Sequence, residues 1–392
     1  MRTVIASEQS ERSNLYVHKD CFAPSGLAMT GMSWMPAEWE PHAATWLAWP
    51  KNASTWPGKL LPEVESVYLQ MITALLPGER VKLLIADELT KKKILKSFPH
   101  AARLHNLEFH KVGYVDSWIR DWGPIFVKKP VIARRNEVTT KQSVCSIKIA
   151  SAPAGPRNDG VTFTKWTFNA WGNKYVDLAR DNGVVNRIAA LKKFKRIDTG
   201  MVLEGGSIDM NGRGACLTTE QCLLNPNRNP KLSKKDIESM LRRFLGVEKV
   251  IWLKKGIAGD DTDGHVDDIA RFVGPRTIVS LPEYADILKK ATDQDGRKLE
   301  IWELPVTGAV DGETLLLEQG VPARFPSLPA SYANFYIGNR VVLVPIYSHA
   351  NDRAALKIIQ KAFPKRKVIG IDCSSLVHGL GAIHCVTQQE PK

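Results

Sequence analysis

One pattern recurs five times along the chain: an amphipathic helix is followed by a short loop and then by an apolar strand. In the clearest copy, apolar residues at helical spacing run from Pro62 to Leu76, the Pro77-Gly78 pair ends the helix, and the strand 80–86 follows. The recurrence predicts an internally repeated α/β fold with helices outside and strands inside. The other predicted helices are Tyr175 to Leu191, Ser233 (the cap) to Leu245, Tyr284 to Ala291 and Asp352 to Phe363, and their strands are 195–198, 250–253, 299–304 and 367–371.

A doubly wound parallel sheet is the alternative α/β architecture, but no G-x-G-x-x-G opens a helix after the first strand. Two segments lie outside the repeated pattern. Residues 1–31 have no periodicity and are predicted to be a poorly ordered N-terminal extension, unless the native start is Met32. Residues 130–160 are basic and rich in turn residues, and they are predicted to form a surface-loop insertion in a single domain that covers 32–392.

Composition predicts a folded protein without a membrane span. Of the 392 residues, 44% are hydrophobic. The longest run without a charged residue, Cys21 to Ala37, contains two prolines and two glycines, whereas a spanning helix needs about 18 apolar residues in a row. No apolar h-region follows Arg2. We therefore expect a cytoplasmic protein whose six cysteines are free thiols.

The formal net charge of +13 is concentrated in two segments. Residues 128–159 carry seven basic and two acidic residues, and residues 231–255 carry eight and three. The second segment would suit a nucleic-acid surface, but a solvated helix face explains it as well and is preferred. We expect neither a nucleic-acid nor a membrane partner, and the sequence permits a homo-oligomer.

Unusual residues gather in the loops that follow the predicted strands: 116–124, 203–209, 259–268 and 378–389. If the repeated units surround an axis, these loops converge at one place. That place would hold carboxylates, an imidazole and a thiol, which is a set typical of covalent catalysis on a cation.

His265 and Asp267 are predicted to share one face of a strand, because residues two apart in a strand point to the same side. An imidazole beside a carboxylate suits acid–base catalysis. Metal ligation by these residues with Asp260, Asp261 and Asp263 is the rival interpretation. No second histidine stands at ligand spacing, so we predict that no metal is bound.

Cys385 is the candidate nucleophile. If Ala382–Thr387 is a strand, Ile383, Cys385 and Thr387 share one face and His384 points away, so His384 is not expected to act as the base for Cys385. A lone cysteine in a strand is usually a small buried hydrophobe. The nearby glycines Gly379 and Gly381 favour a tight, ligand-facing turn instead.

The remaining candidates each have a structural alternative. Asp121 is a candidate carboxylate that could instead form an ion pair with Arg120, and Glu204 could simply belong to a Glu-Gly-Gly turn. Trp118 and Trp122 flank Asp121 and could stack on a planar cation or pack in the core. The cysteines that lack catalytic or zinc spacing are predicted to be structural: Cys216, Cys222 and Cys373.

At these motifs the sequence resembles the agmatine deiminase and bacterial-type peptidylarginine deiminase family of guanidino-group-modifying enzymes. The match covers the chain from about residue 32 to the end. The pieces that carry it are Met35-Pro-Ala-Glu-Trp-Glu-Pro-His42, Thr45-Trp-Leu-Ala-Trp-Pro50, Trp118-Ile-Arg-Asp-Trp-Gly-Pro124, Phe168-Asn-Ala-Trp171, Leu203-Glu-Gly-Gly-Ser207, Thr262-Asp-Gly-His-Val-Asp-Asp268, Ala330-Ser-Tyr-Ala-Asn-Phe-Tyr336 and Ile383-His-Cys-Val-Thr-Gln-Gln389.

The resemblance implies a five-bladed, pseudo-symmetric α/β propeller (pentein) around a central active site, and a hydrolase that needs no metal or organic cofactor. By motif, Cys385 is the expected nucleophile and His265 the general acid/base, with Asp267 beside it. Asp121, Glu204 and Asp267 resemble the carboxylates that bind the guanidinium or support the site. The stacking candidate Trp118 is expected to contact the substrate.

The expected reaction is deimination of agmatine to N-carbamoylputrescine and ammonia, a step in polyamine biosynthesis. Peptidylarginine deimination is the alternative, although secreted enzymes of that kind would call for an export signal. A non-catalytic binder with the same fold, as in the ribosome anti-association factor family, is a third possibility. The joint presence of a thiol, an imidazole and three carboxylates argues against a binder, which has no need of them.

Overall fold

The computed structural model describes residues 33–98, 101–129, 161–192, 194–307, 310–311 and 327–392, all within one compact unit. The predicted N-terminal extension, residues 1–31, and the predicted insertion, residues 130–160, lie outside the described residues. No helix in the described part of the chain is both long enough and apolar enough to cross a membrane.

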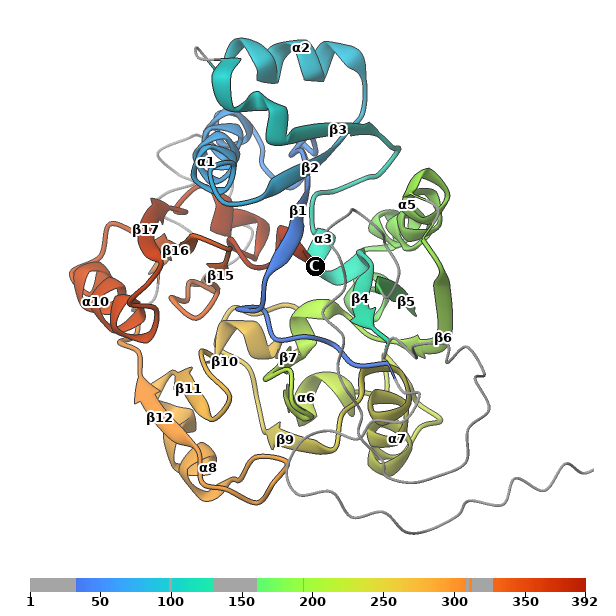
Figure 1. Cartoon of the computed structure of the whole chain (residues 1–392), viewed down its shortest axis with the longest axis vertical. Helices are drawn as coiled ribbons and strands as arrows, with labels where there is room; N and C mark the ends of the chain where they lie inside the picture. The colour runs from blue at the N-terminus through green and yellow to red at the C-terminus, as the bar shows by residue number, and fades with distance from the viewer. Residues whose placement is uncertain (1–32, 99–100, 130–160, 193, 308–309, 312–326) are drawn as a thin grey trace, which may run out of the picture. The chain divides into compact units, whose positions relative to one another are not determined.

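Among the described residues, five small sheets repeat one arrangement (Figure 1): a parallel strand pair has an antiparallel neighbour on one side. The parallel pairs are β1 (His42–Ala48) with β2 (Arg80–Ile85), β5 (Val161–Thr167) with β6 (Arg196–Val202), β8 (Ala215–Thr219) with β9 (Lys249–Leu253), β11 (Thr277–Ser280) with β12 (Glu300–Glu303), and β16 (Val341–Ile346) with β17 (Lys367–Asp372). Their antiparallel neighbours, in the same order, are β18 (Thr387–Pro391), β4 (Ile125–Lys128), β7 (Asp209–Met210), β10 (Ala270–Phe272) and β15 (Tyr336–Ile337).

Two further pairings complete the sheets. Strand β3 (Leu107–Lys111) extends the first sheet parallel to β2, and β13 (Val310–Asp311) pairs with β14 (Ser327–Leu328). Because the sheets are separate rather than one continuous parallel sheet, the doubly wound alternative does not apply to the described residues.

A helix connects the two parallel strands of every unit, as predicted. These helices are α1 (Leu60–Leu75), α5 (Val184–Lys192) after η2 (Val176–Gly183), α7 (Lys234–Leu245), α8 (Ala285–Lys290) after η5 (Pro282–Tyr284), and α10 (Asp352–Ala362). All five predicted helix–strand units are therefore confirmed. In α7, a capping box between Ser233 and Asp236 begins the helix, and Gly246 ends it in the left-handed conformation with φ of 71°.

Short helices occupy the loops. They are α2 (Glu88–Lys96), α3 (Ile119–Trp122), α4 (Ala170–Asn173), α6 (Glu220–Leu223), and the 3-10 turns η1 (Ala101–Asn106), η3 (Gly205–Ser207), η4 (Val266–Asp268) and η6 (Leu376–Gly379). Figure 1 shows α3 and the C-terminal end of the chain near the middle of the sheets, with the connecting helices on the outside.

Burial of apolar side chains explains why the helices dock on the sheets. Helix α7 buries Ile237, Leu241 and Leu245, which recur every four residues, against a core that includes Met201 and Cys216. Full burial of each such aliphatic side chain contributes about 1.5–3 kcal/mol. A larger cluster around Trp46, Tyr68, Phe163, Phe272 and Phe335 fills the rest of the unit.

Candidate active site

Three chain segments that are far apart in the sequence meet around Gly206. A Cβ atom at Gly206 would lie 2.6 Å from Nδ1 of His265, 2.9 Å from Oδ1 of Asp121 and 3.0 Å from Oδ2 of Asp267. Asp121 belongs to α3, Gly206 to η3 after β6, and His265 directly precedes η4. The structure thus brings together the predicted imidazole and two of the predicted carboxylates.

A cavity of about 490 Å³ lies beside this point of convergence. The predicted nucleophile, one predicted carboxylate and the predicted stacking residue all face it. Its lining includes Trp118, Asp121, Trp171, Tyr175, His378 and Cys385. Glu204, His265 and Asp267 are 0% exposed, so they form the buried layer of the site rather than its open wall.

Asp121 accepts two hydrogen bonds from neutral donors. Its Oδ1 accepts from the backbone N–H of Gly206 at 3.0 Å, and its Oδ2 accepts from the indole N–H of Trp171 at 2.9 Å. Burial raises the pKa of Asp121 to about 6; the carboxylates of Asp267 and Glu204 add to the rise, whereas His265 opposes it. A bound cation would favour the ionised form of this carboxyl.

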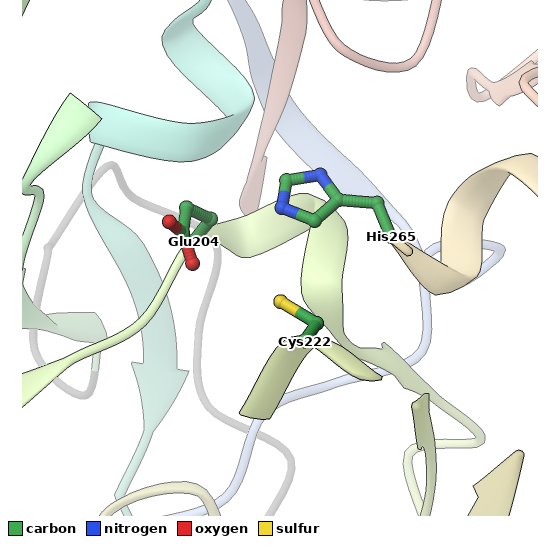
Figure 2. A group of neighbouring side chains, drawn as sticks. All are labelled: Glu204, Cys222 and His265. Atoms are coloured by element: carbon green, nitrogen blue, oxygen red, sulfur yellow. The ribbon is translucent and has the colours of Figure 1, made fainter. Parts of the chain in front are cut away.

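Figure 2 shows His265 beside Glu204 and Cys222. Both ring nitrogens of His265 are buried and lack a hydrogen-bond partner in the described part of the chain. Burial favours the neutral ring, but Asp121, Cys222 and Asp267 outweigh it and raise the pKa of His265 well above its usual value. The imidazole is therefore suited to deliver a proton to a group held near Gly206.

The strand predicted for residues 265–267 is wrong, because η4 begins immediately after His265. Gly264 adopts a φ of 94°, which turns the chain, and the side chains of Asp260 and Thr262 accept hydrogen bonds from the backbone N–H of His265. These local bonds replace a strand ladder. His265 and Asp267 still face one space because of the turn rather than strand alternation.

Glu204 is held by a cation of the chain itself. Its Oε1 accepts a hydrogen bond from Nε of Arg228 at 2.8 Å, while Oε2 has no partner among the described residues. Arg228 also bonds Asp263 and the carbonyl of Thr262 in the loop that leads to His265. The bond from Nε of Arg228 thus uses one carboxylate oxygen of Glu204 and leaves the other without a partner among the described residues.

Two groups of side chains have the donor atoms for a divalent metal. In each, the oxygen, nitrogen or sulfur atoms lie within 4.8 Å of one another; the groups are Glu204, Cys222 and His265, and Asp267, Asp268 and Cys385. Arg228 already places a positive charge on the Glu204 group, which disfavours a second cation there. Cys222 is buried, as predicted for a structural cysteine, and its sulfur lies within 4.8 Å of a ring nitrogen of His265.

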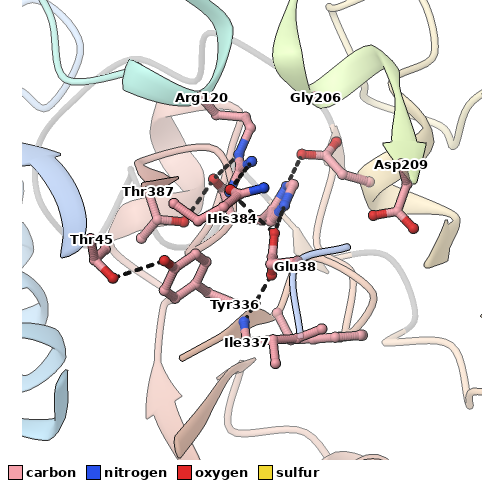
Figure 3. A network of polar contacts seen from close by, with 12 residues as sticks. Glu38, Thr45, Arg120, Gly206, Asp209, Tyr336, Ile337, His384 and Thr387 are labelled. Carbon is pink, nitrogen blue, oxygen red and sulfur yellow. Dashed lines mark hydrogen bonds and ion pairs between the residues drawn. The ribbon is translucent and has the colours of Figure 1, made fainter. Parts of the chain in front are cut away.

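His384 lies between two carboxylates (Figure 3). Its Nδ1 is 2.6 Å from Oδ2 of Asp267 and its Nε2 is 2.8 Å from Oε2 of Glu38. Only a doubly protonated ring can donate to both. Burial acts to raise the pKa of Asp267, but the hydrogen bond and charge of His384, with His265 and Arg271, outweigh it and lower the pKa below its usual range.

This placement corrects the prediction that His384 points away from the site. Residues 383–386 form a turn, and β18 begins only at Thr387, so strand alternation does not apply to His384 and Cys385. The proposed ion pair between Arg120 and Asp121 is also wrong. Arg120 instead reaches Gln389, the carbonyl of His384 and the carboxylate of Glu38.

Cys385 is 5% exposed and lines the cavity at the end of the turn. The predicted tight turn is present: Cβ atoms at Gly379 and Gly381 would lie 2.6 Å and 2.7 Å from the Trp118 ring, so glycine lets the chain pack closely on the indole. Burial, followed by the charges of Asp267, Asp268 and Asp121, raises the pKa of Cys385 well above its usual value.

The comparisons with known proteins identify the family of the chain. Residues 34–391 match the family model described as Porphyromonas-type peptidyl-arginine deiminase. The chain belongs to this family. Over 384 residues it is 36% identical to an agmatine deiminase of Medicago truncatula, an alignment that covers 91% of this chain and 96% of the relative.

Solved structures of similar proteins share the fold of this family member. An agmatine deiminase of Enterococcus faecalis has a TM-score of 0.77 and 31% identity, covering 92% of this chain and 96% of its own. A protein from Porphyromonas gingivalis described as a putative arginine deiminase has a TM-score of 0.74 and 34% identity, covering 92% and 98%. The mixed α/β fold with several small sheets is therefore common to them.

The two tryptophans that flank Asp121 in the sequence have different surroundings in the structure. Trp118 lines the cavity and contacts Trp56, whereas Trp122 packs on Tyr114 in the core. Glu38 and Asn334 stand in motifs that carried the family resemblance, but nothing local in the sequence places either beside Cys385 or its neighbours. Cys216 and Cys373 are buried, as expected for structural cysteines.

Proposed function

We propose that this protein hydrolyses agmatine to N-carbamoylputrescine and ammonia through a covalent intermediate on Cys385. The observation that carries the proposal is the meeting of a thiol, an imidazole and carboxylates at a cavity whose lining includes further acidic side chains. Close relatives named agmatine deiminases support the substrate assignment.

Substrate binding rests on charge and planarity. In the proposal, Asp121 and Asp267 accept the N–H groups of the guanidinium, which fixes its plane and turns its carbon toward Sγ of Cys385. Trp118 stacks on that plane from the cavity wall. Glu204, already paired with Arg228, supports His265 rather than clamping the substrate.

The charges of the cavity lining favour agmatine over arginine. Besides Asp121, the charged lining residues are Asp177, Asp261 and Lys174, and Lys174 lies 3.3 Å from the carboxylate of Asp261. Agmatine ends in an ammonium group that acidic side chains attract. The α-carboxylate of free arginine would face the same acids and be repelled.

In the first half of the reaction, the thiolate of Cys385 attacks the guanidinium carbon and forms a C–S bond. Protonated His265 donates its proton to one nitrogen of the tetrahedral adduct, the C–N bond breaks, and ammonia leaves. A positively charged amidino-thioether remains. The bound guanidinium offsets the carboxylates that otherwise hold the thiol in its protonated form.

In the second half, neutral His265 takes a proton from water as the hydroxide adds to the amidino carbon. The C–S bond then breaks, the thiolate returns, and the oxygen-bound proton of the ureido product goes to solvent. Guanidinium and water thus become a urea, ammonia and one proton.

We also propose that the five repeated sheets are the blades of a propeller that the pairing of β18 with β1 closes. The support is the common strand order of the sheets, and the fact that the antiparallel strand of the first unit comes from the last residues of the chain. A cytoplasmic location would keep the Cys385 thiol reduced, as the mechanism requires.

Ammonia release from agmatine, free arginine and a blocked arginine peptide tests the function. We expect turnover of agmatine and at most weak turnover of the others. The family description makes peptidylarginine deimination the second candidate, and preferred turnover of the peptide would favour it. Absence of ammonia with all three would support a binder.

The Cys385→Ala variant tests the mechanism. We expect no turnover but retained agmatine binding by calorimetry, because the carboxylates that hold the cation are unchanged. Retention of even a few per cent of the activity would contradict the assignment of Cys385 as the nucleophile.

A further inference from the structure

We propose that Asn334 is a further catalytic residue, whose side-chain amide hydrogen-bonds to Sγ of Cys385 and stabilises the thiolate that attacks the substrate. This inference rests on the proposed function, because it assigns a helper to the proposed nucleophile. Asn334 belongs to the loop between β14 and β15 and is 0% exposed.

The orientation of the Asn334 amide is fixed by partners on both sides. Its Oδ1 accepts from the backbone N–H of His384 at 2.9 Å and from that of Cys385 at 3.4 Å. Its Nδ2 donates to Oδ1 of Asp268 at 2.8 Å and to Sγ of Cys385 at 3.2 Å. The backbone N–H groups of His384 and Cys385 face the oxygen of the Asn334 amide, and the carboxylate of Asp268 faces its nitrogen. A flipped amide would therefore place donor against donor and acceptor against acceptor.

The surroundings of Cys385 explain why a donor is needed. Oδ2 of Asp267 lies 3.9 Å from Sγ, and Asp268 and Asp121 add negative charge nearby. These carboxylates suit a cationic substrate but oppose a thiolate. A hydrogen bond to a charged acceptor is stronger than one to a neutral acceptor, so the Asn334 N–H favours the thiolate selectively.

A neutral donor fits this site better than a cation would. A lysine in the place of Asn334 would also stabilise the thiolate, but it would repel the guanidinium that the neighbouring carboxylates attract. The amide gives the sulfur a hydrogen bond without reducing the negative charge available to the substrate. The same side chain also positions the nucleophile, because its oxygen holds the backbone of the turn.

Alkylation of Cys385 by iodoacetamide as a function of pH tests the inference without requiring turnover. Peptide mass spectrometry reports Cys385 separately from the other cysteines. In Asn334→Ala, we expect the apparent pKa of the thiol to rise by about one unit or more, which is the size of a lost hydrogen bond to a charged group. We expect kcat/KM at neutral pH to fall about tenfold or more and to recover in part at higher pH.

Asn334→Asp separates donation from backbone positioning. It keeps the oxygen that accepts from His384 and Cys385 but replaces the N–H donor, so it should raise the thiol pKa at least as much as alanine does. It also covers the case in which the alanine variant fails to fold. Ser331→Ala is the matched control: Ser331 is 1% exposed in the same loop and bonds the carbonyl of Asp268, without contacting the sulfur.

An unchanged alkylation profile in a folded Asn334 variant would overturn the inference, even if the protein deiminates agmatine. Conversely, a shifted profile in a protein that deiminates none of the substrates would sustain the role of Asn334 and reject the proposed function. An equal shift in Ser331→Ala would also overturn the inference, because it would mean that disturbance of the loop, rather than loss of the donor, changes the thiol.

Discussion

At the residue scale, the pKa values of two carboxyl groups that border the same space are shifted in opposite directions. Burial acts to raise the pKa of both. At Asp267, the hydrogen bond and charge of His384, with His265 and Arg271, outweigh burial and lower the pKa. At Asp121, burial and the nearby carboxylates outweigh the charge of His265 and the indole N–H of Trp171, and the pKa is raised to about 6. The difference lies in their partners, since both side chains are buried. Asp121 is therefore the carboxylate of this pair that titrates near neutrality.

The value for Asp121 predicts the acid limb of the pH profile. Below about pH 6 the free enzyme carries a protonated Asp121, which cannot hold a guanidinium by charge, so kcat/KM for agmatine should fall. In the complex, the bound cation lowers the pKa of Asp121, so the acid limb of kcat should lie at lower pH. Steady-state rates between pH 5 and 8 check this prediction. Acid limbs of kcat and kcat/KM that fall at the same pH would contradict it.

Gly206 tests the spatial convergence of the site. Gly206→Ala would place a methyl group against the site-facing atoms of His265, Asp121 and Asp267, all at 3.0 Å or less. A displacement of about 1 Å in such a site costs about a hundredfold in rate, so we expect that loss in kcat/KM with agmatine. The matched control is Gly113→Ala, where a Cβ meets no atom within 4 Å and activity should be unchanged.

At the element scale, the last strand of the chain fixes the site to the first sheet. Strand β18 pairs with β1, with Thr387 opposite Leu47, and begins two residues after Cys385. Across this sheet, Oε2 of Glu390 accepts from Nζ of Lys82 at 2.6 Å and from the indole N–H of Trp46 at 2.7 Å. A buried charge pair thus joins β18 to β2 over the intervening β1.

Glu390→Ala should destabilise the protein strongly, because it leaves the charge of Lys82 buried without its partner. Removing one side of a buried ion pair costs about 3–5 kcal/mol. Denaturant unfolding monitored by Trp fluorescence measures the free energy of unfolding. Glu303→Ala is the control, since its pair with Lys289 is solvent-exposed and should change stability little. Equal losses in the two variants would contradict the role assigned to Glu390.

The sequence predicts elements well where the signal is local. All five helix–strand units follow from helical spacing and caps such as Ser233 and Gly246. The two-residue strands β7 and β15 are too short to leave a pattern. Pairing of β18 with β1 joins opposite ends of the chain, and a turn replaces the strand predicted at Cys385, so the neighbours of His384 could not be deduced from alternation.

At the scale of the whole molecule, the site is assembled from the full length of the described chain. The structure brings together the candidates predicted in loops after strands, because such loops meet when the repeated units pack together. The supporting residues Glu38 and Asn334 come from segments outside those loops. Their contacts depend on tertiary packing alone, which explains why the sequence predicted the chemical groups but not the residues that hold them.

The segment 131–159 should be dispensable for fold and activity. It lies outside the helix–strand units, and the strands on either side form an antiparallel pair in which Lys128 is opposite Val161. A hairpin loop of about five residues, made from Lys129, Pro130, Gly160 and a Gly-Ser bridge, can therefore join them. The free energy of loop closure changes by only about 0.6 kcal/mol per doubling of loop length, so shortening the connection should leave the thermal midpoint nearly unchanged.

Deletion of residues 131–159 removes five basic and two acidic residues and lowers the net charge from +13 to +10, and it leaves the acidic residues that line the cavity in place. Thermal unfolding and agmatine turnover of the deletion variant check the prediction: a lower midpoint would assign the segment to the fold, and lost turnover at an unchanged midpoint would assign it a part in catalysis.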